Sequence, residues 1–228
     1  MDTVPAALRP LVAEIGDQAF TKPTFPKFCI LMTAMILTTG RRTVSNVLRT
    51  VGFLASGHWS NYHQVFCRRK WSLWKVAQIL AEYVVKTWCP DGRIRLVGDE
   101  TVESHPGRKV YGKGRHRDAV RSSHSYTAFR WGHKWVVLAV LVKFPFSTRS
   151  WALPILVALY RSPDWNKKHK KRHKTPNEIM QGLITVVMRW FPDRSFSFTG
   201  DGGYGTHAFA SFAHRYRRRL NLISRFPP

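Results

Sequence analysis

The chain has 228 residues, 44% of them hydrophobic, which is enough apolar material for one large domain or for a small domain followed by a larger one. This composition excludes a disordered chain. Lys and Arg number 37 against 13 Asp and Glu, so the formal net charge is +24 at pH 7, and the summed field favours a polyanion, above all nucleic acid, as the partner. A structural RNA-binding protein and a protein of a membrane surface stay open on charge alone.

Cysteine usage and apolar runs indicate the compartment. The three cysteines are widely spaced and form no CxxC pair: Cys29, Cys67 and Cys89. Their odd count and spacing argue against a disulfide framework and a structural zinc site, and are typical of a reducing cytosol. The N-terminus lacks the order of a secretory signal, and the apolar runs 28–39 and 135–160 are too short or too interrupted to cross a bilayer. We therefore expect a soluble, cytoplasmic protein.

Residues 27–88 carry helical signals. Gly40 interrupts the first apolar pattern, and Thr43 and Ser72 are placed to cap two further helices. Basic segments join these helices, and we take four of their residues as DNA contacts: Arg41, Arg42, Arg68 and Arg69. A helix-turn-helix-like contact to DNA and a helical cap with a solvated basic face are both open interpretations. Three tryptophans of this module could stack on bases or pack in the core: Trp59, Trp71 and Trp74.

A turn cluster at residues 89–92 predicts a domain boundary. It would separate an N-terminal module, residues 1–90, from a larger domain, residues 91–228. After the boundary the pattern changes to strands, which we expect over 94–98, 124–131 and 135–142, followed by an extended segment over 151–159. Gly132 and His133 are predicted to form a tight turn between the second strand and the third.

Residues 163–174 are predicted to form a loop that is almost wholly cationic, and such a loop is either solvated or in contact with phosphate. We take these of its residues as DNA contacts: Lys167, Lys168, Lys170, Lys171 and Arg172. The same role is predicted for basic residues after the first strand: Lys109, Lys113, Arg115 and Arg117. His169 and His173 have a spacing that suits a metal on a helix, but the lysines between them would repel a cation.

The last part of the chain alternates helices and strands. Thr175, three residues before Glu178, predicts a capping box at the start of a helix that runs to Trp190. A strand over 195–199, a helix over 206–219 and a strand over 220–226 follow. Three strands, a helix, a strand, a helix and a strand are the order of an RNase H-like sheet. We therefore predict an α/β fold, an RNase H-like mixed sheet that is incomplete at its C-terminus, preceded by a small all-α module.

Two strand-like segments, 96–101 and 198–205, each carry an acidic residue at their end. If these strands are neighbours in the sheet, Asp99 and Asp201 lie side by side. Phosphodiester cleavage by two metal ions requires carboxylates on neighbouring strands, because the ions sit about 3.5 to 4 Å apart. The sequence therefore predicts that Asp99 and Asp201 bind Mg²⁺ and are catalytic. A turn aspartate and a helix N-cap are the structural alternatives for the two residues.

At these residues the chain resembles the DDE transposases of bacterial insertion sequences, particularly the IS4 and IS701-like group. The resemblance covers roughly residues 94–226 and rests on four segments: 98–101, the basic segment 107–114, the strand 135–142, and 200–205. It implies cut-and-paste DNA transposition with Mg²⁺ or Mn²⁺, by a homo-oligomer located in the bacterial cytoplasm at the nucleoid. The implied partners are the terminal inverted repeats of the transposon and target DNA, with an N-terminal region that helps to recognise the ends.

The resemblance also implies a third carboxylate, a Glu on a helix beyond the last strand. No acidic residue follows Asp201 in the sequence, and Glu178 is placed as a helix cap. Glu100 and Glu103, which flank Asp99, stay open as assisting ligands. We therefore expect a transposase that is truncated before its third carboxylate, and that binds DNA but cuts it poorly or not at all. The alternative is a non-catalytic nucleic-acid-binding protein, either a decayed transposase or a basic RNA binder.

Overall fold

The computed structural model describes residues 5–107, 109–118 and 121–226. The chain divides into two compact units with the boundary between Tyr83 and Val84. The predicted boundary at residue 90 lies a little further along the chain, and its meaning, a DNA-end-binding module before a catalytic domain, stays a prediction. In the described part of the chain, no helix has the length and apolar character that a membrane crossing needs.

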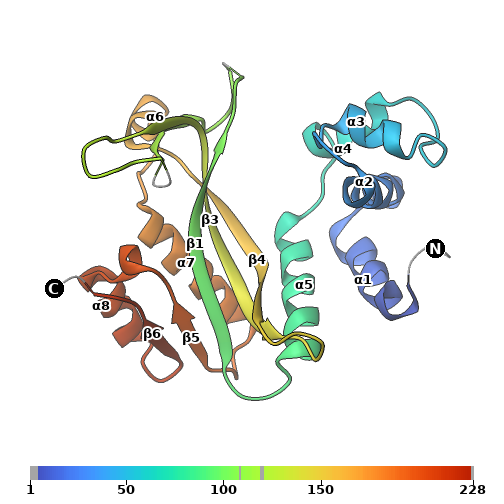
Figure 1. Ribbon diagram of the computed structural model, residues 1–228. Helices are drawn as coiled ribbons and strands as arrows, with labels where there is room; N and C mark the ends of the chain where they lie inside the picture. Colours follow the sequence, from blue (N-terminus) through green and yellow to red (C-terminus); the bar gives the residue numbers. More distant parts are fainter. Residues whose placement is uncertain (1–4, 108, 119–120, 227–228) are drawn as a thin grey trace. The chain divides into compact units, whose positions relative to one another are not determined.

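The N-terminal unit is helical, as predicted (Figure 1). It contains a short 3-10 helix η1 (Ala6–Leu8), the helices α1 (Arg9–Ala19), α2 (Phe25–Leu37), α3 (Val44–Thr50) and α4 (Ser60–Cys67), and most of α5 (Leu73–Trp88). Thr43 caps α3, since its side chain accepts a hydrogen bond from the backbone of Asn46. The fully buried side chains of Leu31, Leu48 and Tyr62 belong to its core.

One of the candidate base-stacking residues is taken up by packing within this unit. The Trp71 ring stacks on Phe20 with centroids 5.0 Å apart, and its indole N–H donates to the carbonyl of Val65 at 2.8 Å. Trp59 and Trp74 are exposed. A role in base stacking therefore stays a prediction for these two alone.

The C-terminal unit is built on a six-stranded mixed sheet (Figure 1). Its strands are β1 (Ile94–Ser104), β2 (Gly114–Arg117), β3 (Phe129–Lys143), β4 (Ser150–Tyr160), β5 (Phe196–Thr199) and β6 (Leu220–Ile223). The order is β2-β3-β1-β5-β6, and β4 also pairs with β3. The partners of β3 are all antiparallel to it, whereas β5 runs parallel to both β1 and β6. The predicted α/β fold is confirmed: the antiparallel strands β1, β3 and β4, continued by β5 and β6 parallel to β1, are the arrangement expected of an RNase H-like sheet, and β2 is a sixth strand beside β3.

The predicted turn at Gly132 and His133 is wrong, because both residues lie inside the continuous strand β3. Gly132 pairs with Ser104 on one side and with Gly114 on the other. A Cβ atom at this position would collide with the carbonyl oxygen of Glu103. The glycine thus permits a close approach of two backbones and does not reverse the chain. The predicted strand over 124–131 begins only at Phe129.

The C-terminal unit also contains helices after β4. These are α6 (Pro163–Lys168), α7 (Pro176–Trp190) and α8 (His207–Arg215), and a short 3-10 helix η2 (Gly202–Tyr204) lies before α8. The predicted capping box of α7 is present, with Thr175 and Glu178 as its two members. Met180 and Ile184 of α7 are fully buried, as are Leu96 and Phe198 of the sheet. The predicted loop over 163–174 is wrong in its first half, where α6 forms, and α8 and β6 are shorter than predicted.

Candidate active site

Asp99 lies inside β1, which continues to Ser104, so the predicted strand end at residue 98 is wrong, whereas Asp201 follows the end of β5 at Thr199. The pairing of β1 with β5 ends at Val97 opposite Thr199. Asp99 lies two residues after Val97, and Asp201 lies two residues after Thr199. The two aspartates therefore flank the point where β5 separates from β1. The prediction that β1 and β5 are neighbours in the sheet is therefore confirmed.

A cavity of about 480 Å³ lies at this point. Its lining contains both aspartates, two further carboxylates and three cations: Asp99, Asp201, Glu100, Asp118, Arg117, Arg130 and Lys134. The aromatic ring of Tyr204 also lines it. In the described residues, no group of three or more His, Cys, Asp or Glu side chains has the arrangement of a metal centre.

The four carboxylates of this cavity differ in their partners. Glu100 forms an ion pair with Lys134, and Asp118 forms one with Arg130 at 2.8 Å. Asp99 and Asp201 are exposed, and each accepts a hydrogen bond from a nearby backbone N–H, of Glu100 at 2.7 Å and of Gly203 at 3.0 Å. Within the described parts of the chain neither aspartate is in an ion pair with a Lys or Arg side chain.

Two such oxygen donors suit a divalent metal ion. Hard cations such as Mg²⁺ prefer carboxylate oxygens, and Mg²⁺ is usually held by one or two carboxylates while it keeps several water ligands. Asp201 also has the structural role that the sequence left open for it, because it is the N-cap of η2. The cap uses one carboxylate oxygen, so the second oxygen of the same group is left for a ligand. The donor chemistry of Asp99 and Asp201 therefore fits the predicted metal.

Tyr204 is a residue of this site that the sequence analysis missed. Its side chain is 1% exposed, and among the described residues the carboxylate of Glu100 is the acceptor that its hydroxyl approaches, without a hydrogen bond of good geometry. Burial raises the pKa of this phenol, and the negative charges of Glu100, Asp201 and Asp99 raise it further. The hydroxyl is therefore a neutral donor close to the three carboxylates.

Asp118 is the second residue that was missed. It is buried, and it lies in the chain between β2 and β3. Nothing in the local sequence distinguishes it from a turn aspartate. Its ion pair with Arg130 holds a cation beside the aspartates, so Asp118 orders the positive side of the cavity.

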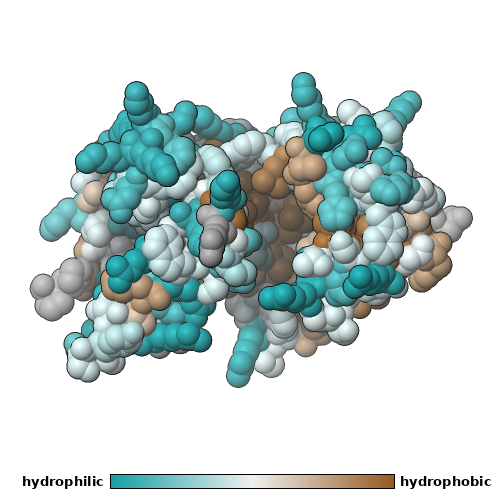
Figure 2. Space-filling view, turned by 90° about the horizontal axis from the view of Figure 1, so that it is seen from above, coloured by the Kyte–Doolittle hydropathy of each residue, from teal (hydrophilic) through white to brown (hydrophobic). Residues whose placement is uncertain are grey.

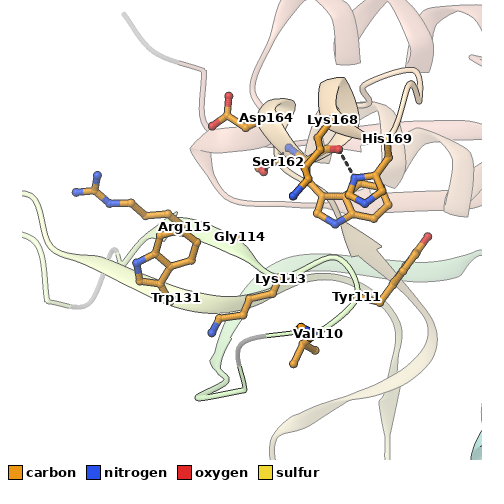
Figure 3. A pocket seen from close by; sticks show the side chains of 12 residues that line it. Val110, Tyr111, Lys113, Gly114, Arg115, Trp131, Ser162, Asp164, Lys168 and His169 are labelled. Carbon is orange, nitrogen blue, oxygen red and sulfur yellow. Dashed lines mark hydrogen bonds between the residues drawn. The ribbon is translucent and has the colours of Figure 1, made fainter.

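The structure separates the predicted DNA contacts into groups. Arg117 lines the carboxylate cavity, whereas Lys109, Lys113, Arg115 and Lys168 line a second cavity (Figure 3). Four residues in and after α6 are exposed: Lys167, Lys170, Lys171 and Arg172. Hydrophilic side chains predominate on the face of this unit that carries β2 and α6 (Figure 2). The remaining four belong to the N-terminal unit and are exposed there: Arg41, Arg42, Arg68 and Arg69.

The alternative of a zinc site at His169 and His173 does not hold. Helix α6 ends at Lys168, so the two histidines do not share a helix face. The His169 ring stacks on Trp165, and Nδ1 of His173 lies 3.1 Å from the side-chain amide of Asn166. Both rings are thus engaged within the fold.

Comparisons with known proteins add the following. The sequence model of a family described as "DDE superfamily endonuclease" matches residues 17–228. A search of curated proteins finds no match. Among solved structures, a piggyBac transposase in a synaptic complex with hairpin DNA is similar at 12% identity and a TM-score of 0.44, and the match covers 96% of this chain. The chain spans about half of the transposase chain, of which 47% is covered.

Proposed function

The chain belongs to the DDE superfamily of endonucleases, and from this premise we propose that it is a DNA transposase that cleaves transposon ends and transfers the strands to target DNA. The observation that carries the proposal is the pair Asp99 and Asp201: Asp99 lies on β1, Asp201 follows the parallel neighbour β5, and both line one cavity. The alternative roles of the two residues, as a turn aspartate and an N-cap, do not require a shared cavity.

Asp99 and Asp201 would hold Mg²⁺ or Mn²⁺. Such an ion, when bound, supplies the Lewis acidity that activates water and stabilises the departing 3′ oxygen of DNA. Glu100 is bound to Lys134 and Asp118 to Arg130, so these two carboxylates balance cations of the site. Glu178 is used in the cap of α7 and is not the third carboxylate that the resemblance implies.

The other residues of the cavity have roles that follow from their charge and burial. Arg117 is exposed beside the aspartates and would contact a phosphate next to the scissile one. Arg130 is held by Asp118 at 2.8 Å, so its position is fixed before DNA binds. The hydroxyl of Tyr204 would donate a hydrogen bond to Glu100 and orient this carboxylate beside the aspartates.

DNA is the proposed partner because it matches the charge of the chain. The cationic residues of α6 and of the segment after it would contact the phosphate backbone of the transposon end, and Lys109, Lys113 and Arg115 would do the same near β2. We further propose an IS4 or IS701-like mode of transposition, with a homo-oligomer as the active form and the N-terminal unit as a reader of the terminal repeats. The proposed location is the cytoplasm, at the nucleoid.

The proposal is tested by nicking of supercoiled plasmid in Mn²⁺, measured together with binding of the same DNA. Asp99→Asn and Asp201→Asn are compared with the wild-type chain and with Asp193→Asn, an exposed aspartate that lies before β5 and not after it. We expect slow nicking by the wild-type chain and by Asp193→Asn, and none above background by the other two. Equal nicking by all four proteins, with unchanged binding, would contradict the catalytic role of the pair.

A second candidate function is a non-catalytic nucleic-acid-binding protein. The net charge of +24 favours it, because such a charge binds nucleic acid without any metal-binding carboxylate. Binding to terminal-repeat duplex, random duplex and structured RNA at one salt concentration separates the two candidates. A preference for the terminal repeat supports the transposase, and equal affinities support the second candidate.

A further inference from the structure

A second cavity, of about 680 Å³, lies between β2, the beginning of β3 and α6 (Figure 3). We call it the aromatic pocket and define it by Tyr111, Lys113, Arg115, Trp131, Trp165 and His169. It is separate from the carboxylate cavity. Arg130 lines the carboxylate cavity and its neighbour Trp131 lines the aromatic pocket. The linings of the two cavities share no residue.

The walls of the aromatic pocket are flat rings. Trp165 and His169 are stacked, with centroids 3.9 Å apart and planes at 15°, and the ring of Tyr111 meets Trp165 edge to face at 5.0 Å. Trp131 is 61% exposed. In the close view of the pocket, Lys113 lies between Trp131 and Tyr111 (Figure 3). An indole with this much exposed surface in a cavity is a free stacking face.

The charge of the aromatic pocket favours an anion. Lys109, Lys113, Arg115 and Lys168 line it against one carboxylate, Asp164, so the formal balance of these five groups is four minus one, or +3. In the described residues none of the four cations is in an ion pair. Lys113 is held in place, because its ammonium donates to the carbonyl of Gly107 at 2.7 Å and lies 6.0 Å from the centroid of Trp131.

The combination of rings and cations identifies the class of ligand. A free phosphate would use the cations and leave the rings exposed, whereas an apolar ligand would leave the cations without partners. The volume lies within the range of about 300 to 1,000 Å³ that is usual for small-molecule sites, and it accommodates a base with its sugar and phosphate. A nucleotide in a duplex has both faces of its base covered by stacking, so only an unpaired nucleotide can present a face to Trp131.

We propose that the aromatic pocket binds one unpaired nucleotide of the DNA substrate, with the base on Trp131 and the phosphate at Lys113 and Arg115. This inference rests on the proposed function, which makes DNA the substrate. Asp99 lies opposite Val137 of β3, and Trp131 is six residues before Val137 on the same strand. At about 3.3 Å per residue the separation along the strand is roughly 20 Å. The bound nucleotide is therefore on the order of six steps from the one at the aspartates, at 3.4 Å per step.

The test compares two DNA probes. One is a fully paired duplex, and the other is the same duplex with a single-stranded extension of about six nucleotides that carries fluorescent 2-aminopurine. Trp131→Ala removes the proposed stacking face. Trp151→Ala is the matched control, because Trp151 is also exposed, at 52%, and lies at the start of β4 outside the pocket. Both residues are surface residues, so circular dichroism should be unchanged in both variants.

We expect the wild-type chain to bind the extended probe more tightly than the paired one and to quench its 2-aminopurine. Trp131→Ala should lose the quenching and roughly 5- to 150-fold in affinity for the extended probe, which is the loss expected for one base stack, while its affinity for the paired duplex stays the same. Trp151→Ala should behave as the wild type does.

Three results would overturn the inference, and they differ in what else they overturn. If Trp131→Ala binds the extended probe as the wild type does, the pocket has no nucleotide and the proposed function is unaffected. If the wild-type chain binds neither probe, the proposed function fails and the inference fails with it. If an RNA extension binds as tightly as the DNA one and is equally sensitive to Trp131→Ala, the assignment of the pocket to DNA is wrong.

Discussion

Asp99 and Asp201 are distinguished from the other acidic residues of their cavity by what surrounds them. Glu100 and Asp118 have cationic partners, whereas the donors to the side chains of the two aspartates are backbone N–H groups within the described part of the chain. A cation that enters the cavity therefore finds two carboxylates that need not give up a salt bridge. This difference makes Asp99 and Asp201 the metal ligands in the proposed function. It depends on one ion pair at Glu100 and one at Asp118.

Tyr204 allows a prediction at the same scale. Its buried hydroxyl makes no hydrogen bond of good geometry among the described residues, and its approach to Glu100 offsets its desolvation cost only in part. Tyr204→Phe should leave the free energy of unfolding unchanged or raise it by up to about 1 kcal/mol. If the hydroxyl orients a carboxylate of the cavity, the same variant should slow plasmid nicking.

Denaturant unfolding and plasmid nicking by Tyr204→Phe check both parts of this prediction. A loss of stability larger than about 1 kcal/mol would mean that the hydroxyl is satisfied in the folded protein. Unchanged nicking with unchanged stability would remove Tyr204 from the site.

At the scale of elements, the capping box of α7 gives a prediction on pH. The backbone N–H of Thr175 donates to Glu178 and lowers the pKa of this carboxyl from its usual 4.5, and the Thr175 hydroxyl, Arg172 and His173 act in the same direction. A lowered pKa means that the folded state favours the charged carboxylate. The stabilisation is therefore complete above pH 4.5 and is lost as the pH falls through the lowered pKa of the folded state.

The comparison of Glu178→Gln with the wild type measures this contribution. Because Glu178 is largely exposed, we expect the variant to be less stable by under about 1 kcal/mol at neutral pH. The difference in melting temperature should shrink as the pH falls below 4.5. A difference that grows in acid would contradict the assigned direction of the pKa shift.

The elements also show what could be predicted from the sequence. The caps at Thr43 and Thr175 were correct, because a cap depends on a few consecutive residues. The turn at Gly132 was wrong, because a glycine that allows backbones to approach across a sheet has the same local signature as one in a turn. The helix α6 was missed among lysines that are typical of a loop, although Ser162 caps it and Pro163 begins it.

The candidate site, like the elements, could be predicted only in part. Asp99 and Asp201 could be found because each ends an apolar segment, and their proximity followed from one assumption about strand pairing. Tyr204 and Asp118 could not be assigned, because their place in the cavity depends on how β2, β3 and η2 meet. Such contacts between distant segments leave no periodic signal in the sequence.

At the scale of the whole molecule, the excess of cations governs the response to salt. Each phosphate contact releases condensed counterions, so the logarithm of the affinity for duplex DNA falls with the logarithm of salt concentration by about 0.9 per contact. Replacement of both Lys167 and Lys171 by Ala should reduce this slope by roughly 2, without a change in preference between DNA sequences. Fluorescence anisotropy at several salt concentrations measures the slope. An unchanged slope would place these two exposed lysines away from the DNA.

The central claim is that Asp99 and Asp201 together hold a divalent metal ion, and calorimetric titration with Mn²⁺ tests it most directly. The wild-type chain should bind Mn²⁺, and Asp99→Asn and Asp201→Asn should each weaken the affinity by at least about tenfold, since each removes a charged ligand from one site. Asp193 lies before β5, at the other end of the strand from Asp201, so Asp193→Asn should bind Mn²⁺ as the wild type does. Equal affinity in all four proteins would show that the pair is not a metal site, and the account of the active site would be wrong.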